Sequence, residues 1–173
     1  MKMNDDLLAA FNDQITLEFT ASQVYRQLAI EMETRDLPGM ASWLRAQADE
    51  EIVHANKFID HVTDRGGHPQ IGAIPAPQLE ITKAADVFEA ALEYERNNSA
   101  AIRELYRHAD KVDDLDSRPL LNWFIDEQVE EEATVGEILG WLKLIGDDGT
   151  GLLKLDTELG TRTSGGTADD NGH

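Results

Sequence analysis

The chain has 173 residues, about the length of one domain, and it carries 34 Asp and Glu residues against 15 Lys and Arg residues, for a formal charge of −19. This charge disfavours nucleic acids and anionic membrane surfaces as partners, because both require a basic patch, and it favours cations as ligands or substrates. The absence of cysteine excludes disulfides, thiolate catalysis and cysteine-ligated iron–sulfur clusters, and the absence of a long apolar run or signal peptide leads us to expect a cytoplasmic protein.

Glycine and proline divide the chain into four long segments that we expect to be helices, at about residues 5–34, 38–65, 81–110 and 117–145. These segments are rich in Ala, Leu, Glu, Gln and Arg, which favour helices. A short fifth helix is expected at 151–159. Together they predict one helical domain over residues 1–160, followed by a small, polar tail at 161–173 that we expect to be disordered.

The links between these segments indicate how the helices are arranged. The first and third links are short, so the helices on either side of each should be antiparallel neighbours. The second link, at about 66–80, is long enough to run the whole length of a helix. The expected fold is therefore all-α: an up-down-down-up four-helix bundle with a long crossover.

Each long segment carries an apolar stripe with alternating spacings of three and four residues, and a glutamate interrupts each stripe near its middle. These glutamates are Glu18, Glu51, Glu95 and Glu131. A midpoint stays at the same level whether a helix runs up or down, so the four carboxylates should converge in one layer. We find no Lys or Arg on these stripes at that level, and buried charges without compensation are costly. We therefore expect a bound metal to compensate the negative charge of these carboxylates: iron or manganese, and less specifically zinc.

His54 follows Glu51 by three residues, which places both side chains on one side of a helix. A single Glu-x-x-His is common by chance. Combined with glutamates on three other helices, it is typical of di-metal carboxylate bundles. Tyr25 is either core filling or a neighbour that hydrogen-bonds a ligand or donates an electron. Gln128 is either a partner for bound oxygen or water, or a weak ligand.

Two further acidic groups have more than one reading. Glu50, Glu127 and Glu130 flank the layer, and they indicate either a third, looser metal position or a solvated acidic face. A second group precedes the fourth helix and suggests either an acidic channel for cations or a plain solvated loop. It consists of Asp113, Asp114 and Asp116.

Over about residues 5–160, the sequence resembles the ferritins, specifically the haem-free bacterial type. The resemblance rests on four motifs: NDQITLEFTASQVY around Glu18, ADEEIVH around Glu51 and His54, YER around Glu95, and WFIDEQVEEE around Gln128 and Glu131. Ile52 and Val53 occupy the positions among which bacterioferritins place a haem-ligating methionine, so no haem is expected. A second Glu-x-x-His, typical of bacterioferritins and rubrerythrin-like peroxidases, is missing from the fourth helix.

The resemblance implies a role for each of these residues. Glu18, Glu51 and His54 would hold a first iron, Glu51 would bridge, and Glu95 and Glu131 would hold a second. Glu50, Glu127 and Glu130, with Glu131, would form a third site, and Tyr25 and Gln128 match neighbours of the centre.

The resemblance also implies a homo-oligomeric cage of twenty-four subunits that oxidises Fe(II) with O₂ or H₂O₂ and stores a ferric mineral. Leu152, Leu153, Leu155 and Leu159 would then pack around a four-fold axis. One alternative is a di-iron or di-manganese oxidase or peroxidase that stores no mineral. Another is a binding or structural bundle whose carboxylates are vestigial.

Overall fold

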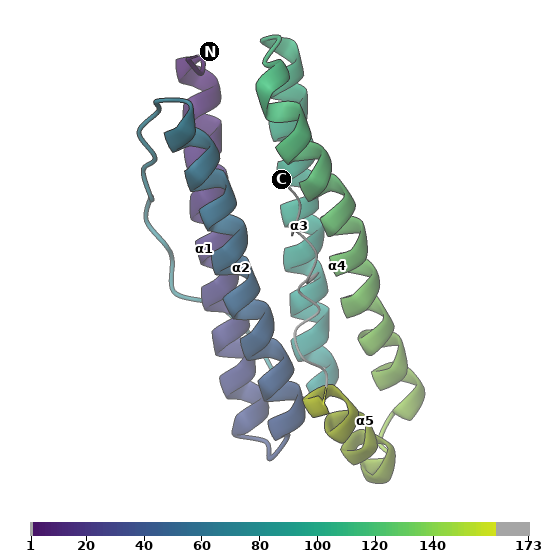
Figure 1. The fold of residues 1–173 in the computed structure, drawn as a ribbon. Coiled ribbons are helices and arrows are strands. Elements are labelled where there is room, and N and C mark those ends of the chain that lie inside the picture. Colours follow the sequence, from purple (N-terminus) through teal and green to yellow (C-terminus); the bar gives the residue numbers. More distant parts are fainter. Residues whose placement is uncertain (1, 162–173) are drawn as a thin grey trace.

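The computed structural model describes residues 2–161, which form five α-helices and no strand. The helices are α1 (Asp5–Glu33), α2 (Pro38–Asp64), α3 (Ala84–Lys111), α4 (Arg118–Ile145) and α5 (Gly149–Thr161). The first four lie along a common axis, and α5 lies at one end of the bundle (Figure 1). The expected all-α bundle with a short last helix is therefore confirmed. The tail that we expected to be disordered lies outside the described residues, except for Thr161, which belongs to α5.

Local hydrogen bonds explain where the helices begin. At α1, the side chain of Asn4 accepts the backbone N–H of Asp6 at 2.9 Å. The third helix begins at Ala84 rather than near residue 81, because the Asp86 carboxylate accepts the backbone N–H groups of Thr82 and Lys83 and holds them outside the helix. A turn at Leu115–Ser117 precedes α4.

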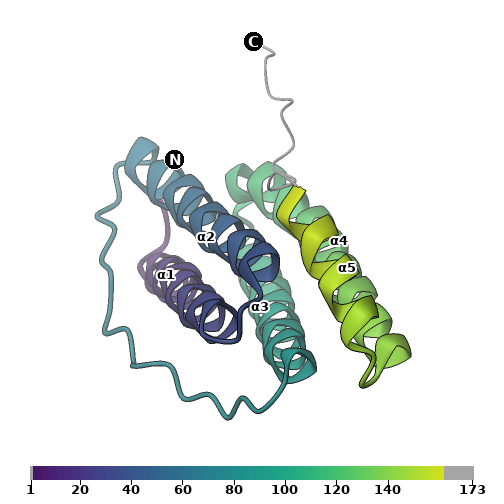
Figure 2. The same cartoon turned by 90° about the horizontal axis from the view of Figure 1, so that it is seen from below.

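The crossover between α2 and α3 lies along α1. Its Gly72 N–H donates to Thr16 Oγ1 at 2.8 Å, and its Ile81 carbonyl accepts from Arg35 Nη2 at 2.9 Å. Thr16 lies near the middle of α1 and Arg35 just beyond its end, so the crossover follows the length of that helix, as Figures 1 and 2 show. This path makes α2 and α3 parallel and completes the up-down-down-up order.

The buried hydrophobic side chains form two separate clusters, one toward each end of the bundle. One cluster includes Leu7, Phe11, Phe58, Ile102 and Phe124. The other includes Leu28, Met32, Met40, Phe88 and Ile138, together with Leu155 and Leu159 of α5. Each of the four long helices carries at least one buried glutamate between the two clusters. The layer of glutamates therefore divides the hydrophobic core in two.

At the end of the bundle where α2 ends and α4 begins, an ion pair joins these two helices. Arg65 donates to both oxygens of Asp114, at 2.6 and 2.7 Å, and Ser117 Oγ donates to Asp114 at 2.5 Å. Burial alone would raise the pKa of Asp114, but the bonds from Arg65 and Ser117 outweigh it, and the pKa is lowered. Asp114 is thus a buried structural acid and not part of a solvated loop, whereas Asp113 and Asp116 are exposed.

The helix α5 caps the start of α2. Leu37, at the N-cap of α2, provides no side-chain hydrogen bond. The Asp156 carboxylate of α5 instead accepts the backbone N–H of Met40 at 2.8 Å. Gly39 permits this contact, because a Cβ at that position would lie 1.8 Å from the carbonyl oxygen of Asp156. None of the helices within residues 2–161 is both long enough and apolar enough to cross a membrane.

We expect Gly39→Ala to displace α5 and to lower the melting temperature. The new methyl group must move the backbone of Asp156, which breaks the cap on Met40 and exposes Leu155 and Leu159. Differential scanning calorimetry at a fixed protein concentration measures the effect. Gly140→Ala in α4 is the matched control, because no described atom lies within 4 Å of a Cβ there. The control should be neutral or stabilising by up to about 1 kcal/mol. Equal melting temperatures for the two variants would contradict this account of α5.

Candidate metal centre

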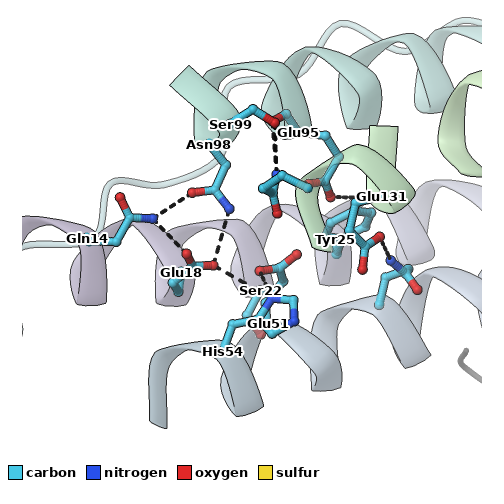
Figure 3. Close-up of polar contacts among 12 residues, drawn as sticks. Gln14, Glu18, Ser22, Tyr25, Glu51, His54, Glu95, Asn98, Ser99 and Glu131 are labelled. Atoms are coloured by element: carbon cyan, nitrogen blue, oxygen red, sulfur yellow. Dashed lines mark hydrogen bonds and ion pairs between the residues drawn. The ribbon is translucent and has the colours of Figure 1, made fainter. Parts of the chain in front are cut away.

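Four glutamates, one from each long helix, converge in the layer between the two hydrophobic clusters. Glu18 of α1, Glu51 of α2, Glu95 of α3 and Glu131 of α4 are 0, 1, 2 and 7% exposed. Figure 3 shows Glu18, Glu51, Glu95 and Glu131 with their side chains directed into the interior of the bundle. The structure therefore brings together the four residues that interrupt the apolar stripes.

Glu18, Glu51 and His54 form the first close group. Each offers a ligand atom, and these atoms lie within 4.8 Å of one another. His54 Nδ1 lies 3.3 Å from Glu51 Oε2 and 4.0 Å from Glu18 Oε2. The imidazole is held by edge-to-face packing against Trp123 and Phe124, with ring centroids 5.7 and 5.5 Å away. This group contains the residues that the resemblance assigns to the first iron.

A second close group lies beside the first and shares His54 with it. Its members are Glu50, His54, Glu127 and Glu131, with ligand atoms again within 4.8 Å of one another. Glu130 was also expected here, but it is exposed and lies outside the group. One residue along an α-helix is a rotation of about 100°, so the neighbour of buried Glu131 points toward solvent.

Glu95 belongs to neither group in this conformation. It accepts a hydrogen bond from the Tyr25 hydroxyl and another, at 3.1 Å, from Gln128 Nε2. These bonds hold its carboxylate between α1 and α4, so the residues assigned to the second iron do not form one close group. Tyr25 thus contacts a candidate ligand, which is one of the two roles that we considered for it, whereas Gln128 was expected to contact bound oxygen or water and instead donates to Glu95. Gln128 Oε1 is buried and has no hydrogen-bond partner among the described residues.

Burial and mutual repulsion disfavour ionised carboxylates in this layer. Burial is the largest cause that raises the pKa of Glu18 and of Glu51 well above the ordinary value. For Glu131, burial and then the nearby Glu95 raise the pKa to about 9. Burial also raises the pKa of Glu95, although its bonds from Tyr25 and Gln128 oppose the shift.

No lysine or arginine within residues 2–161 forms an ion pair with any of these four glutamates. Nearby arginines are engaged at the surface instead: Arg26 pairs with Asp49, and Arg45 pairs with Glu33. The layer thus combines several carboxylates, one imidazole and no balancing cation. This mixed oxygen and imidazole donor set fits a divalent ion such as Fe(II) or Mn(II).

Sequence reasoning missed four polar residues, three that bond directly to the glutamates and one that bonds to Gln128. Gln14 and Asn98 contact Glu18, Gln47 Nε2 donates to Glu131 at 2.8 Å, and Ser99 Oγ accepts from Gln128 at 3.2 Å. A signal was present for two of them. Gln14 and Gln47 each precede a stripe glutamate by four residues, which places them on the same helix face.

We expect the stability of the metal-free protein to fall as the pH rises from 6 to 8. Glu131 has a pKa of about 9 in the folded chain, against about 4.3 when unfolded, so the folded state binds more protons between these values. The free energy of unfolding must then decrease as the pH rises through this window. Calorimetry of chelator-treated protein at the two pH values measures the difference.

Glu131→Gln keeps the shape and removes the titration, so the pH-dependent loss should be smaller in this variant. Glu93→Gln, on the exposed face of α3, is the matched control and should behave like the wild type. A wild-type melting temperature that is the same at pH 6 and pH 8 would refute the raised pKa of Glu131 in the folded chain.

Comparison with known proteins agrees with this geometry. The sequence profile described as "Ferritin-like domain" matches residues 8–145. The chain is 37% identical over 161 residues to the bacterial non-heme ferritin of Staphylococcus saprophyticus and 34% identical to that of Staphylococcus aureus strain MRSA252. Each alignment covers 93% of this chain and at least 96% of the relative.

Among solved structures, an engineered closed form of the Archaeoglobus fulgidus ferritin superposes with a TM-score of 0.92 at 35% identity, covering 94% of this chain and 99% of that one. The open-pore ferritin of the same archaeon superposes with a TM-score of 0.90 at 36% identity, covering 92% of this chain and 98% of that one. With a glutamate layer at the middle of a four-helix bundle and matches over nearly the whole of both chains, this chain belongs to the ferritin family and is similar in sequence to its haem-free bacterial members.

Proposed function

We propose that the protein is a ferroxidase that oxidises Fe(II) and stores the ferric product inside a cage of twenty-four subunits. The observation that carries this proposal is a pair of acidic groups that share His54, in which no Lys or Arg of residues 2–161 forms an ion pair with Glu18, Glu51 or Glu131. Divalent iron is a substrate that such a layer can bind. Membership of the ferritin family and the non-heme ferritins among its relatives support the same reading.

In this proposal, the glutamates bind and orient two Fe(II) ions as substrates. Glu18, Glu51 and His54 receive one ion, Glu51 is shared, and Glu95 and Glu131 receive the other. Each ion gives one electron to the same O₂, which takes up two protons and leaves as H₂O₂, while both irons become Fe(III). The anionic carboxylates favour this outcome, because hard oxygen ligands stabilise the higher charge of the product.

The surrounding residues have distinct proposed roles. Tyr25 and Gln128 hold the Glu95 carboxylate through their hydrogen bonds, and Gln47 holds Glu131. A third position beside the two Fe(II) ions is offered by Glu50, Glu127, His54 and Glu131. A further Fe(II) bound there could be the next to be oxidised or could supply an electron. Glu130 has the same proposed role, although its side chain is exposed in this conformation. A cytoplasmic location stays a prediction.

Glu51→Gln and His54→Ala should each lower the initial rate of aerobic Fe(II) oxidation by at least about tenfold. Glu51 is the shared ligand in the proposal, and His54 belongs to both acidic groups. Stopped-flow absorbance of the ferric product gives the rate. His68→Ala, at an exposed histidine in the crossover, is the matched control and should oxidise iron like the wild type. Unchanged rates in both site variants would show that the oxidation site lies elsewhere.

Storage in a cage is tested by loading the protein with excess Fe(II) in air and then separating it by size. We expect protein and iron to elute together in a particle far above the 19.2 kDa of one chain. Iron and protein concentrations are measured in each fraction, and bovine serum albumin treated in the same way controls for adsorbed iron. Iron that is oxidised but precipitates outside the protein would overturn storage and would leave the non-storing oxidase as the better reading.

A further inference from the structure

Glu18 is the most deeply buried of the stripe glutamates, and both of its carboxylate oxygens accept hydrogen bonds from side-chain amides. Gln14 Nε2 donates to Oε1 at 2.7 Å, and Asn98 Nδ2 donates to Oε2 at 3.4 Å. Gln14 is one turn earlier on α1, whereas Asn98 is on α3. The carboxylate is therefore held from its own helix and from a neighbouring one (Figure 3).

A third hydrogen bond fixes the orientation of both amides. Gln14 Nε2 also donates to Asn98 Oδ1 at 2.7 Å. Rotating the Gln14 amide would put its carbonyl against the Glu18 carboxylate, and rotating the Asn98 amide would break its bond from Gln14 and turn its own carbonyl toward Glu18. The three residues thus form a closed ring of hydrogen bonds with one consistent arrangement.

The amides orient Glu18 without cancelling its charge. An arginine or lysine here would form an ion pair and compete with a metal for the carboxylate. A neutral amide donor fixes the direction of the lone pairs and leaves the negative charge available. The Glu18 carboxylate that Gln14 and Asn98 hold has its Oε2 atom 4.0 Å from His54 Nδ1, beside Glu51.

The two amides also separate Glu18 from the surface. Gln14 lines a groove of about 700 Å³ between α1 and α3, and Asn98 lines a neighbouring groove of about 610 Å³ beside the end of the crossover. Both side chains are nevertheless almost fully buried, at 4 and 3% exposed. Each amide therefore lies between a groove and the carboxylate.

From these contacts, we infer that Gln14 and Asn98 are positioning residues that hold the Glu18 carboxylate in its metal-binding orientation and so set the affinity of the Glu18, Glu51 and His54 group for a divalent cation. This inference rests on the proposed function, since it concerns how tightly the same site takes its substrate. The two residues act through Glu18 and do not themselves contact the cation.

The test replaces each amide with an apolar side chain of similar size. Asn98→Leu and Gln14→Met remove the donors while filling the same space. Asn97→Leu is the matched control, because Asn97 is the preceding residue on α3 and lines the same groove as Asn98 but is exposed. The probe is Co(II), which reports its coordination through visible absorption and is not oxidised under the conditions of the titration. Calorimetry in parallel gives the stoichiometry and the affinity of each binding event.

We expect each site variant to weaken one Co(II) binding event by about tenfold or more and to change its absorption spectrum, while a separate binding event keeps its affinity. Asn97→Leu should match the wild type. In Fe(II) oxidation, the site variants should show a higher KM with a smaller change in kcat. A role in folding alone would instead lower the melting temperature and leave the Co(II) titration unchanged.

Co(II) affinities within twofold of the wild type in both site variants would overturn the inference. Should Asn98→Leu fail to fold, Gln14→Met decides the question, because methionine has nearly the same length as glutamine and Gln14 lines a groove that can accommodate a small shift. A wild-type protein that neither binds Co(II) nor oxidises Fe(II) would instead refute the proposed function. The two failures are therefore distinguishable.

Discussion

Four buried carboxylates in the middle of a hydrophobic core are the constraint on which this structure depends. Each long helix gives up one core position to a glutamate, and together these glutamates divide the core into two apolar clusters. Ionised and uncompensated, such a layer would oppose folding, because each buried charge costs several kcal/mol. The protein meets this cost through neutral donors around the carboxylates and through raised pKa values, and no Lys or Arg of residues 2–161 forms an ion pair with the four glutamates.

The remaining architecture keeps the layer at one depth. The clusters on either side fix the four helices relative to one another, and the crossover along α1 makes α2 and α3 parallel. Separate contacts secure the two ends of the bundle. At one end, Arg65 and Asp114 tie α2 to the start of α4, and at the other, Asp156 of α5 caps α2. A layer of metal ligands needs such support, since small displacements of ligands weaken a site.

Three of the four carboxylates have their own supporting donors, and the donors differ. Glu18 is held by two amides, Glu95 by a phenol and an amide, and Glu131 by a single amide from α2. This difference explains why the chain presents two close groups that share His54 and not one group of all four glutamates. It also makes the environment of the Glu18 group more rigid, because its donors bond to each other as well as to the carboxylate.

The helical fold, the order of the helices and the depth of the glutamate layer could be predicted from the sequence, because the 3-4 spacing of apolar residues and the lengths of the links carry that information directly. The sequence also identified Glu51 and His54 as a pair, since three residues on a helix is a local relation. The contacts between side chains of different helices could not be predicted in this way. Asn98 meets Glu18 from another helix, Glu130 points to solvent, and Asp114 is buried against Arg65. These outcomes depend on how side chains from different helices rotate and pack, and periodicity along one segment does not encode that.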